Sequence, residues 1–300
     1  MRILIACIHY PVCSGRFIRR ALERLGHDVK TAGPYTANQI WGMEIDARYN
    51  WLPDFIDGTD EGRELSPTGD DDPDWYPDLI ITADSAYTLT ADWERPHILW
   101  GQDNHVRDYR FREWKAMFLC HTWGARMDEP NAHWLPPCYD PMMCTDLGRE
   151  RDIDVTMVGY PYPDRQQIVQ ELANAGLKVQ AGIGAVYDEY NALYNRSKIG
   201  FVKSNCGDVT NRVFENMAQG CCVLADEARD FSRLGLIPYR DYWPYRDAQD
   251  AVKQARHLIE SGLWQTIARQ GKIAGEPHTW DARAQMVLET VKGMVGRANI

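Results

Sequence analysis

The apolar positions of the first thirty residues follow the pattern of a β–α–β unit. Residues 2–8 (RILIACI) form a continuous apolar run, which predicts a strand buried on both faces. After a turn that contains Pro11 and Gly15, residues 16–25 carry apolar side chains at helical spacing, and the next strand begins at residue 28. Strands that are separated by helices predict a parallel sheet with helices on both faces.

The same alternation continues along the chain and predicts a second α/β set. Expected buried strands lie at 79–83 and 97–100 in the first set, and at 154–159, 178–184, 198–204 and 221–226 in the second. A polar segment of mixed charge separates the sets between Pro141 and Arg151. The predicted fold class is therefore α/β, with a Rossmann-like domain at 1–148 and another at 149–300.

A final amphipathic helix is expected after residues 278–283 (HTWDAR). Its apolar face would comprise Met286, Val287, Val291 and Met294. We interpret this helix as structural.

Composition places the chain among ordinary globular proteins, with 44% hydrophobic and 25% charged residues. No apolar run approaches the roughly 18 residues that a membrane span needs, and residues 1–8 are too short for a signal peptide. The eight cysteines include no C-x-x-C pair, which is typical of buried thiols in a reducing compartment and does not predict zinc. We expect a cytoplasmic protein without a membrane span.

The charge distribution bears on possible partners and metals. A net charge of −10 disfavours nonspecific binding to nucleic acid. Ten acidic residues against the single Arg63 fill residues 54–78, and the segment DDDPD at 70–74 could suggest paired aspartates that hold a metal beside a sugar nucleotide. Because no buried strand directly precedes this segment, we interpret it as a solvated acidic loop and predict no metal site.

Residues 208–226 (DVTNRVFENMAQGCCVLAD) carry the most informative chemistry. Asp208 or Thr210 can cap a helix that ends before a buried strand. Arg212 and Glu215 are three positions apart and share one helix face, where a carboxylate can accept hydrogen bonds from both ribose hydroxyls. Arg212 and the amides near Gly207 can meet phosphate oxygens, and the alternative is a surface salt bridge.

Neighbouring segments favour a ligand site. Gly159 and Arg165 place a flexible turn and a cation at the carboxyl end of a strand, where open α/β sheets bind ligands. Gly184 allows backbone amides to approach a planar base, and Tyr187 could cover that base. We expect Tyr190 and Tyr194, which are four positions apart, to pack in the core.

Aromatic residues are numerous, with eleven tryptophans and fifteen tyrosines. Several tryptophans stand in polar loops, namely Trp41, Trp51, Trp75, Trp93 and Trp243. Aromatic faces stack on sugar rings and on nucleobases, so this excess supports a carbohydrate or a nucleoside acceptor without separating the two.

Several of these segments, in this order, resemble one family. The segments are WGQDNHVRDY (100–109), HWLPPCYDPM (133–142), DIDVTMVGYPYPDRQQIVQEL (152–172), YDEYNALYNRSKIGF (187–201), NRVFENMAQGCCVLAD (211–226) and IARQGKIAGEPHTWDAR (267–283). They resemble the CgeB-like glycosyltransferases, relatives of the group-one glycosyltransferases with the GT-B fold. The resemblance runs from about Ile98 to the end of the chain.

This resemblance implies two Rossmann-like domains that face each other across a cleft holding the active site. The last helix, 281–300, would pack back on the N-terminal domain. The C-terminal domain would hold a nucleoside-diphosphate sugar, with a uridine donor favoured, as a co-substrate and without a metal or other cofactor.

The resemblance also implies roles for residues of the C-terminal domain. Glu215 matches the glutamate that holds the ribose, and Arg165 and Arg212 match positions near the diphosphate, Arg165 more securely by position. Many relatives that retain stereochemistry carry a second glutamate eight residues before the first. Here that position is Gly207, beside Asp208, so retention and inversion both stay open.

Sugar transfer without a metal needs cations at the leaving diphosphate. An inverting mechanism also needs a carboxylate or a histidine that takes the acceptor proton. Lys203 is a further candidate for the diphosphate. For the acceptor, Asp103 is the preferred residue and His105 follows it, although Asp103 could cap a helix and His105 could be a surface histidine. His9 is another candidate for the acceptor. Its loop, HYPVCSG from His9 to Gly15, matches by resemblance the place where the first turn of the family approaches the donor phosphates and the acceptor.

The resemblance and these residues thus predict a glycosyltransferase. The sequence does not indicate its acceptor or its oligomeric state. The acceptor could be a glycan precursor, a metabolite, a protein side chain or a hydroxymethylated DNA base. Binding to DNA would need a basic cleft, such as one made of Arg107, Arg110, Arg112 and Lys115. The rival functions are a sugar-nucleotide-binding protein without turnover and a sugar-nucleotide epimerase of the same architecture.

Overall fold

The computed structural model describes residues 1–35, 39–40, 43–54, 75–84 and 95–294. It divides the chain into two compact units, which we call the first unit (Met1–Pro136 with Trp280–Ile300) and the second unit (Pro137–Thr279). The segment DDDPD, together with Trp41 and Trp93, lies outside the described residues.

The division falls at Pro136, before the boundary that the mixed-charge segment predicts at 148/149. Residues 137–148 belong to the second unit because its side chains hold their backbone. The amide of Thr145 donates to Asn191 Oδ1 at 3.1 Å, and the amide of Leu147 donates to Asn195 Oδ1 at 2.5 Å. Composition cannot reveal hydrogen bonds of this kind.

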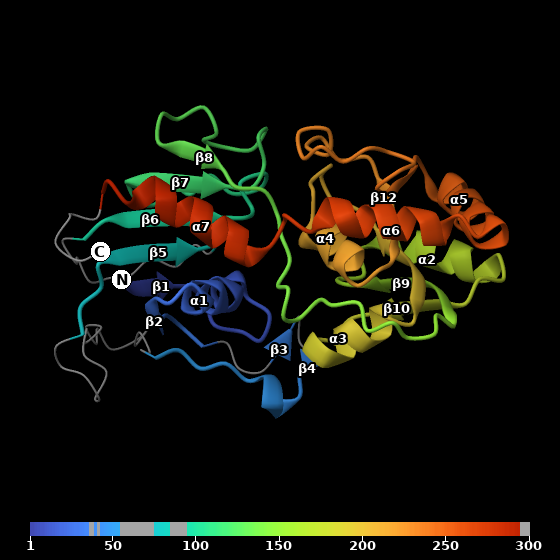
Figure 1. The fold of residues 1–300 in the computed structure, drawn as a ribbon, viewed down its shortest axis with the longest axis horizontal. Helices are drawn as coiled ribbons and strands as arrows, with labels where there is room; N and C mark the ends of the chain where they lie inside the picture. Colours follow the sequence, from blue (N-terminus) through green and yellow to red (C-terminus); the bar gives the residue numbers. More distant parts are fainter. Residues whose placement is uncertain (36–38, 41–42, 55–74, 85–94, 295–300) are drawn as a thin grey trace. The chain divides into compact units, whose positions relative to one another are not determined.

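The first unit contains a six-stranded parallel sheet in the order β2-β1-β5-β6-β7-β8 (Figure 1). Its strands are β1 (Arg2–Ala6), β2 (Asp28–Ala32), β5 (Leu79–Ala83), β6 (His97–Gly101), β7 (Ala116–Leu119) and β8 (Ala132–Trp134), and helix α1 (Ser14–Arg24) joins β1 to β2. The small elements β3 (Gln39–Ile40), β4 (Met43–Glu44) and η1 (Ala47–Tyr49) follow β2.

Helix α7 (Trp280–Val291) packs on α1 in this unit, as the resemblance implied for the last helix. Trp280 stacks on Phe17 with ring centroids 5.9 Å apart, and Arg24 Nε lies 2.7 Å from Asp281 Oδ1.

The expected apolar face of α7 is only partly correct. Val287 and Val291 are fully buried, but Met286 is 42% exposed and Met294, beyond the end of the helix, is 37% exposed. Instead of the two methionines, Trp280, Ala284 and Leu288 are buried together with the two valines. These residues lie on the side of the helix that meets α1.

The second unit contains a five-stranded parallel sheet in the order β10-β9-β11-β12-β13. Its strands are β9 (Ile153–Val158), β10 (Val179–Gly182), β11 (Ser197–Val202), β12 (Cys222–Asp226) and β13 (Trp243–Tyr245). Its helices are α2 (Pro163–Asn174), α3 (Tyr187–Tyr194), α4 (Asn211–Ala218), α5 (Ala248–Ser261) and α6 (Trp264–Gly275).

Alternation along β12 shows how this sheet builds a core on each face. Cys222 and Leu224 pack with Leu172 of α2 and with α5, whereas Val223 and Ala225 pack with Phe214 of α4 and with α3. A strand buried on both faces reads as a continuous apolar run, which is the pattern that predicted it. The sheet thereby presents the carboxyl ends of β9, β11 and β12 along one edge.

Two expectations about composition concern the chain as a whole. All eight cysteines are free thiols, and only Cys206 is exposed. Among the described residues, no helix is long and apolar enough to cross a membrane.

Candidate functional site

Helix α4 carries Arg212 and Glu215 in its first turns, both half-buried. Thr210 occupies the N-cap position, but its side chain makes no capping hydrogen bond. Asp208 lies two residues before the N-cap, and its Oδ1 accepts hydrogen bonds from the amides of Asn205 and Cys206, both at 3.1 Å. The expected side-chain cap is therefore wrong, and the carboxylate of Asp208 closes the preceding loop instead.

Glu215 is held by a tyrosine of α3. The hydroxyl of Tyr190 donates to Glu215 Oε2 at 2.6 Å, while Oε1 has no hydrogen bond to any described residue. Burial raises the pKa of Glu215, and the hydrogen bond from Tyr190 and the charge of Arg212 oppose that rise. One carboxylate oxygen is thus fixed and the other can accept hydrogen bonds from a ligand.

Arg212 lies at the carboxyl end of β9. Its Nη1 donates to the carbonyl oxygen of Val158 at 3.1 Å, and no other hydrogen bond of this guanidinium to a described residue is present. Gly159 has a φ of +153°, and a Cβ there would overlap Nη1 of Arg212. Arg212 can therefore occupy this position only beside a glycine, and its guanidinium retains donors for an anion.

Arg165 is placed close to Arg212 but is more fully used. It is 4% exposed, and its Nε and Nη2 donate to the carbonyl of Lys203 at 3.1 and 2.7 Å, while Nη1 donates to the carbonyl of Tyr160 at 3.1 Å. Burial and the positive charge of Arg212 lower the pKa of Arg165. Arg165 thus joins the loops that follow β9 and β11. Arg212, in contrast, keeps N–H groups that make no hydrogen bond to a described residue.

Lys203 follows β11 and is paired with carboxylates. Its Nζ lies 3.1 Å from Asp226 Oδ2 and 3.5 Å from Asp164 Oδ2, and it also donates to the carbonyl of Ser204 at 2.7 Å. A diphosphate would have to compete with these partners.

Three further positions shape the backbone of this edge. Gly184 and Gly207 have φ values of +100° and +77°, in the region that favours glycine. The second glutamate of the family would stand at position 207, where a side chain would strain the backbone. Tyr187 has a φ of 48° and is only 7% exposed, so its ring is packed into the unit.

In the first unit, His9 and Gly15 lie in closely packed surroundings. His9 is fully buried, its ring centroid lies 4.4 Å from that of Trp51, and burial lowers its pKa to about 4. A Cβ on Gly15 would overlap the sulfur of Cys7, so glycine allows α1 to approach β1.

Asp103 and His105 follow β6. Asp103 is half-buried and precedes a turn, not a helix; its carbonyl accepts hydrogen bonds from the amides of Val106 and Arg107. The carboxylate lies 3.8 Å from Arg107 Nε. His105 packs edge-on against His121 with ring centroids 4.6 Å apart, and is half-buried rather than a surface histidine.

Sequence reasoning missed Asp84, directly after β5. Its Oδ1 accepts hydrogen bonds from the amides of Gln102 (2.9 Å) and Asp103 (3.1 Å) and from the Tyr109 hydroxyl (2.8 Å). Burial and the negative charge of Asp103 raise the pKa of Asp84 to about 7. An acidic residue directly after the predicted strand 79–83 was the available signal.

The basic residues near Asp103 do not make an uninterrupted cationic surface. Arg107 faces Asp103, and Arg110 Nε lies 3.6 Å from Asp108 Oδ2. Two of the four cations that the sequence suggested for DNA binding are thus already paired with carboxylates.

Comparison with known proteins supports the reading of the fold. Residues 141–289 match the family model described as glycosyl transferase-like. A comparison with curated proteins finds no match.

Solved structures resemble the chain over nearly all of its length. Anabaena HepE in complex with UDP-glucose is 12% identical, with a TM-score of 0.67, covering 98% of this chain and 100% of that one. An alpha-glucosyltransferase in complex with UDP and a 13-mer DNA with a central A:G mismatch is 11% identical, with a TM-score of 0.68 and coverages of 98% and 99%. Sucrose-phosphate synthase from Thermosynechococcus elongatus is 12% identical, with a TM-score of 0.58 and coverages of 97% and 98%.

The predicted α/β fold with two parallel sheets is thereby confirmed. The chain has the fold of the GT-B glycosyltransferases, and its residues 141–289 match the glycosyl transferase-like family.

Proposed function

We propose that the chain is a metal-independent glycosyltransferase that takes its sugar from a nucleoside diphosphate, with uridine as the favoured base. The observation that carries this proposal is the pair on α4. Glu215 is oriented by Tyr190 with one oxygen open, and Arg212 lies one turn away with unused donors. Both HepE and the alpha-glucosyltransferase are described with UDP or UDP-glucose bound.

The chemistry assigns a part to each group. The open oxygen of Glu215 accepts hydrogen bonds from the ribose hydroxyls. Arg212 neutralises charge on the departing diphosphate, which is the main requirement when no metal is present. Arg165 positions the loops around it, and Lys203 joins the diphosphate only if it leaves its carboxylate partners.

On the acceptor side, Asp103 is the group proposed to take the proton from the attacking hydroxyl. Asp84 acts as a positioning residue, since its carboxyl holds the amide of Asp103. The acceptor class stays open among glycans, metabolites, proteins and DNA bases. The alpha-glucosyltransferase structures contain DNA, which keeps a modified base among these acceptors.

A panel of UDP, GDP and ADP with their sugars, in EDTA, tests the donor site by thermal shift. At a concentration of about 100 Kd, one nucleotide should stabilise the protein by roughly 2.7 kcal/mol. Glu215→Gln should largely remove that stabilisation, whereas Glu171→Gln, at a half-buried site of α2, should keep it. The proposal fails if no nucleotide stabilises the wild type, or if the stabilisation appears only when a divalent metal is added.

Turnover separates the proposal from its rivals. A transferase releases UDP slowly from the sugar nucleotide by hydrolysis even without an acceptor, and faster with one. A binding protein shows stabilisation without release. An epimerase releases UDP at a rate that no acceptor changes and frees an epimerised sugar.

A further inference from the structure

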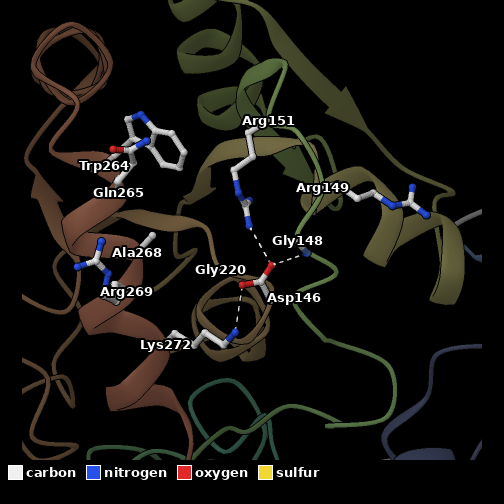
Figure 2. Close-up of a pocket in the computed structure, with 10 residues that line it drawn as sticks. All are labelled: Asp146, Gly148, Arg149, Arg151, Gly220, Trp264, Gln265, Ala268, Arg269 and Lys272. Carbon is white, nitrogen blue, oxygen red and sulfur yellow. Dashed lines mark hydrogen bonds and ion pairs between the residues drawn. The ribbon is translucent and has the colours of Figure 1, made fainter.

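A cavity of about 400 Å³ opens in the second unit where β9 and β12 begin (Figure 2). Three segments line it: the stretch 146–151 that leads into β9, Gly220 before β12, and residues 264–272 of α6. Arg212 contacts the other end of β9, at Val158. Six strand residues span about 20 Å, so this cavity is separate from the candidate donor site.

Positive charge gathers in this cavity although the chain as a whole is acidic. Four cations (Arg149, Arg151, Arg269 and Lys272) line it with a single carboxylate, Asp146. The net charge of the chain is −10. A local cationic concavity on such a background attracts small anions.

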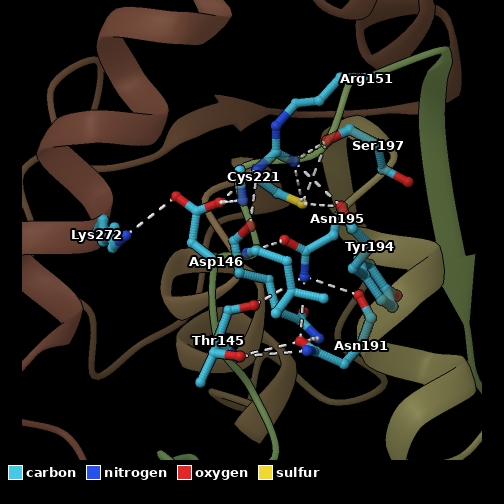
Figure 3. Close-up of polar contacts among 12 residues, drawn as sticks. Thr145, Asp146, Arg151, Asn191, Tyr194, Asn195, Ser197, Cys221 and Lys272 are labelled. Carbon is cyan, nitrogen blue, oxygen red and sulfur yellow. Dashed lines mark hydrogen bonds and ion pairs between the residues drawn. The ribbon is translucent and has the colours of Figure 1, made fainter.

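The carboxylate is already neutralised within the protein (Figures 2 and 3). Asp146 lies 3.0 Å from Lys272 Nζ and 3.6 Å from Arg151 Nη2, and it accepts a hydrogen bond from the amide of Gly148. It therefore does not cancel the remaining cations.

Arg151 is structural. Its guanidinium donates to the carbonyls of Tyr194 (3.1 Å) and Ser197 (Figure 3). It also donates to the carbonyl of Gln219 (2.8 Å), so it ties the residues before β9 to α3, to β11 and to the residue after α4. These bonds keep its charge at the cavity wall while leaving little for a ligand.

Other donors remain unused. Arg149 and Arg269 are exposed and make no hydrogen bond or ion pair with the part of the chain that the structure describes. Lys272 uses one of its three N–H groups on Asp146. Gln265, Arg269 and Lys272 are four and three positions apart on α6 and so share one helix face.

Beside these donors lies Trp264, half-buried at the start of α6. A guanidinium and an ammonium on one face suit a phosphate dianion, and an indole suits a flat or apolar group attached to it. We propose that this cavity binds a small organic phosphate, with the phosphate on Arg269 and Lys272 and the attached group against Trp264.

Calorimetry at low ionic strength with inorganic phosphate and with adenosine 5′-monophosphate (AMP) as probes tests the site. Both probes should bind saturably, and AMP should bind more tightly. Arg269→Gln and Lys272→Gln should each weaken binding about tenfold. Arg269 has no described partner to lose, so its substitution should leave the fold intact, as the unfolding temperature would verify.

A control variant separates this site from other cations. Arg256→Gln removes an exposed arginine of α5 that pairs with Glu260, and it should not change the affinity for phosphate. The proposal is overturned if phosphate does not saturate at millimolar concentrations, or if Arg256→Gln weakens binding as much as Arg269→Gln.

Two other outcomes would also overturn it. Binding to phosphatidylglycerol vesicles without binding of soluble phosphate would assign the cations to a lipid surface. The proposed contact with the indole would be wrong if AMP bound no more tightly than inorganic phosphate and if Trp264→Phe left the affinity for AMP unchanged.

Discussion

The hydroxyl of Tyr190 donates a 2.6 Å hydrogen bond to Oε2 of Glu215 and so couples α3 to α4. The tyrosine is held in turn by the core, since its ring lies 4.6 Å from that of the fully buried Tyr194. A carboxylate that is partly withdrawn from water is thereby fixed in one orientation before a ligand arrives. Pre-organisation of this kind lowers the entropy cost of binding.

Removal of this hydroxyl should weaken nucleotide binding without removing the carboxylate. Tyr190→Phe should raise the Kd for UDP about three- to tenfold, because a hydrogen bond to a buried carboxylate contributes about 1 kcal/mol or more. Calorimetric titration measures this change. Tyr239→Phe, at an exposed site, is the matched control. An unchanged Kd in Tyr190→Phe would show that Glu215 does not depend on the tyrosine.

The affinity for UDP should fall on acidification. Burial raises the pKa of Glu215, so protonation of this carboxyl begins at a higher pH than for an exposed glutamate. Ribose hydroxyls donate to the ionised form, so binding releases a proton and its affinity rises with pH until the carboxyl is fully ionised. Titration at several pH values from 5 to 8 measures the slope.

In Glu215→Gln the same titration should show a weak affinity with a smaller dependence on pH. A slope that is equal in both proteins would assign the pH dependence to another group.

Gly159 should be intolerant of a side chain for two separable reasons. At a φ of +153° an alanine costs about 1–3 kcal/mol in backbone strain, and its Cβ would also displace Arg212. Gly176→Ala is the matched control, because Gly176 has a φ of +85° but nothing within 4 Å of an added Cβ.

Both variants should therefore lose stability, as chemical denaturation measures, but only Gly159→Ala should lose affinity for UDP. Equal affinities in the two variants would mean that the position of Arg212 does not matter for the nucleotide.

Because of Asp84, the free energy of unfolding of the first unit should decrease as the pH rises towards 7. Its pKa is about 7 in the folded protein, well above that of an aspartate in an unfolded chain, because of burial and the charge of Asp103. Between the two pKa values the folded state keeps a proton that the unfolded chain has released, so stability falls as the pH rises through this window and levels off above it.

Asp84→Asn cannot ionise and retains an oxygen that can accept from Tyr109. Its urea midpoint should therefore change less between pH 5 and pH 8 than that of the wild type. Asp108→Asn, an exposed control beside Arg110, should keep the full wild-type change. A wild-type midpoint that rises over this range would contradict the assignment.

The apolar runs were sufficient to locate most of the sheets. Strands such as β5 and β12 are buried on both faces, and their composition alone distinguishes them from surface segments. Strands β7, β8 and β13 of the two sheets were not predicted. Strand β7 is fully buried but only four residues long. Strands β8 and β13 have three residues each, with half-buried positions at the end of a sheet, where the apolar pattern is weak.

The sequence predicted that Arg212 and Glu215 share one helix face, but not which arginine keeps N–H groups for a ligand. The spacing of Arg212 and Glu215 on one helix follows from helical geometry. The sequence favoured Arg165 for the diphosphate, whereas folding directs the donors of Arg165 to the carbonyls of Tyr160 and Lys203. Backbone carbonyls leave no mark on a sequence, so their competition for a guanidinium cannot be foreseen.

The sequence by itself therefore determined the two α/β units and the helix that carries Arg212 and Glu215, because burial periodicity and helical spacing are local properties. Only the tertiary structure decided which cations remain available, that Tyr190 holds Glu215, and that Asp84 holds the amide of Asp103. The physical reason is that each of these contacts joins residues from different elements, and hydrogen-bond geometry and desolvation depend on their arrangement in space.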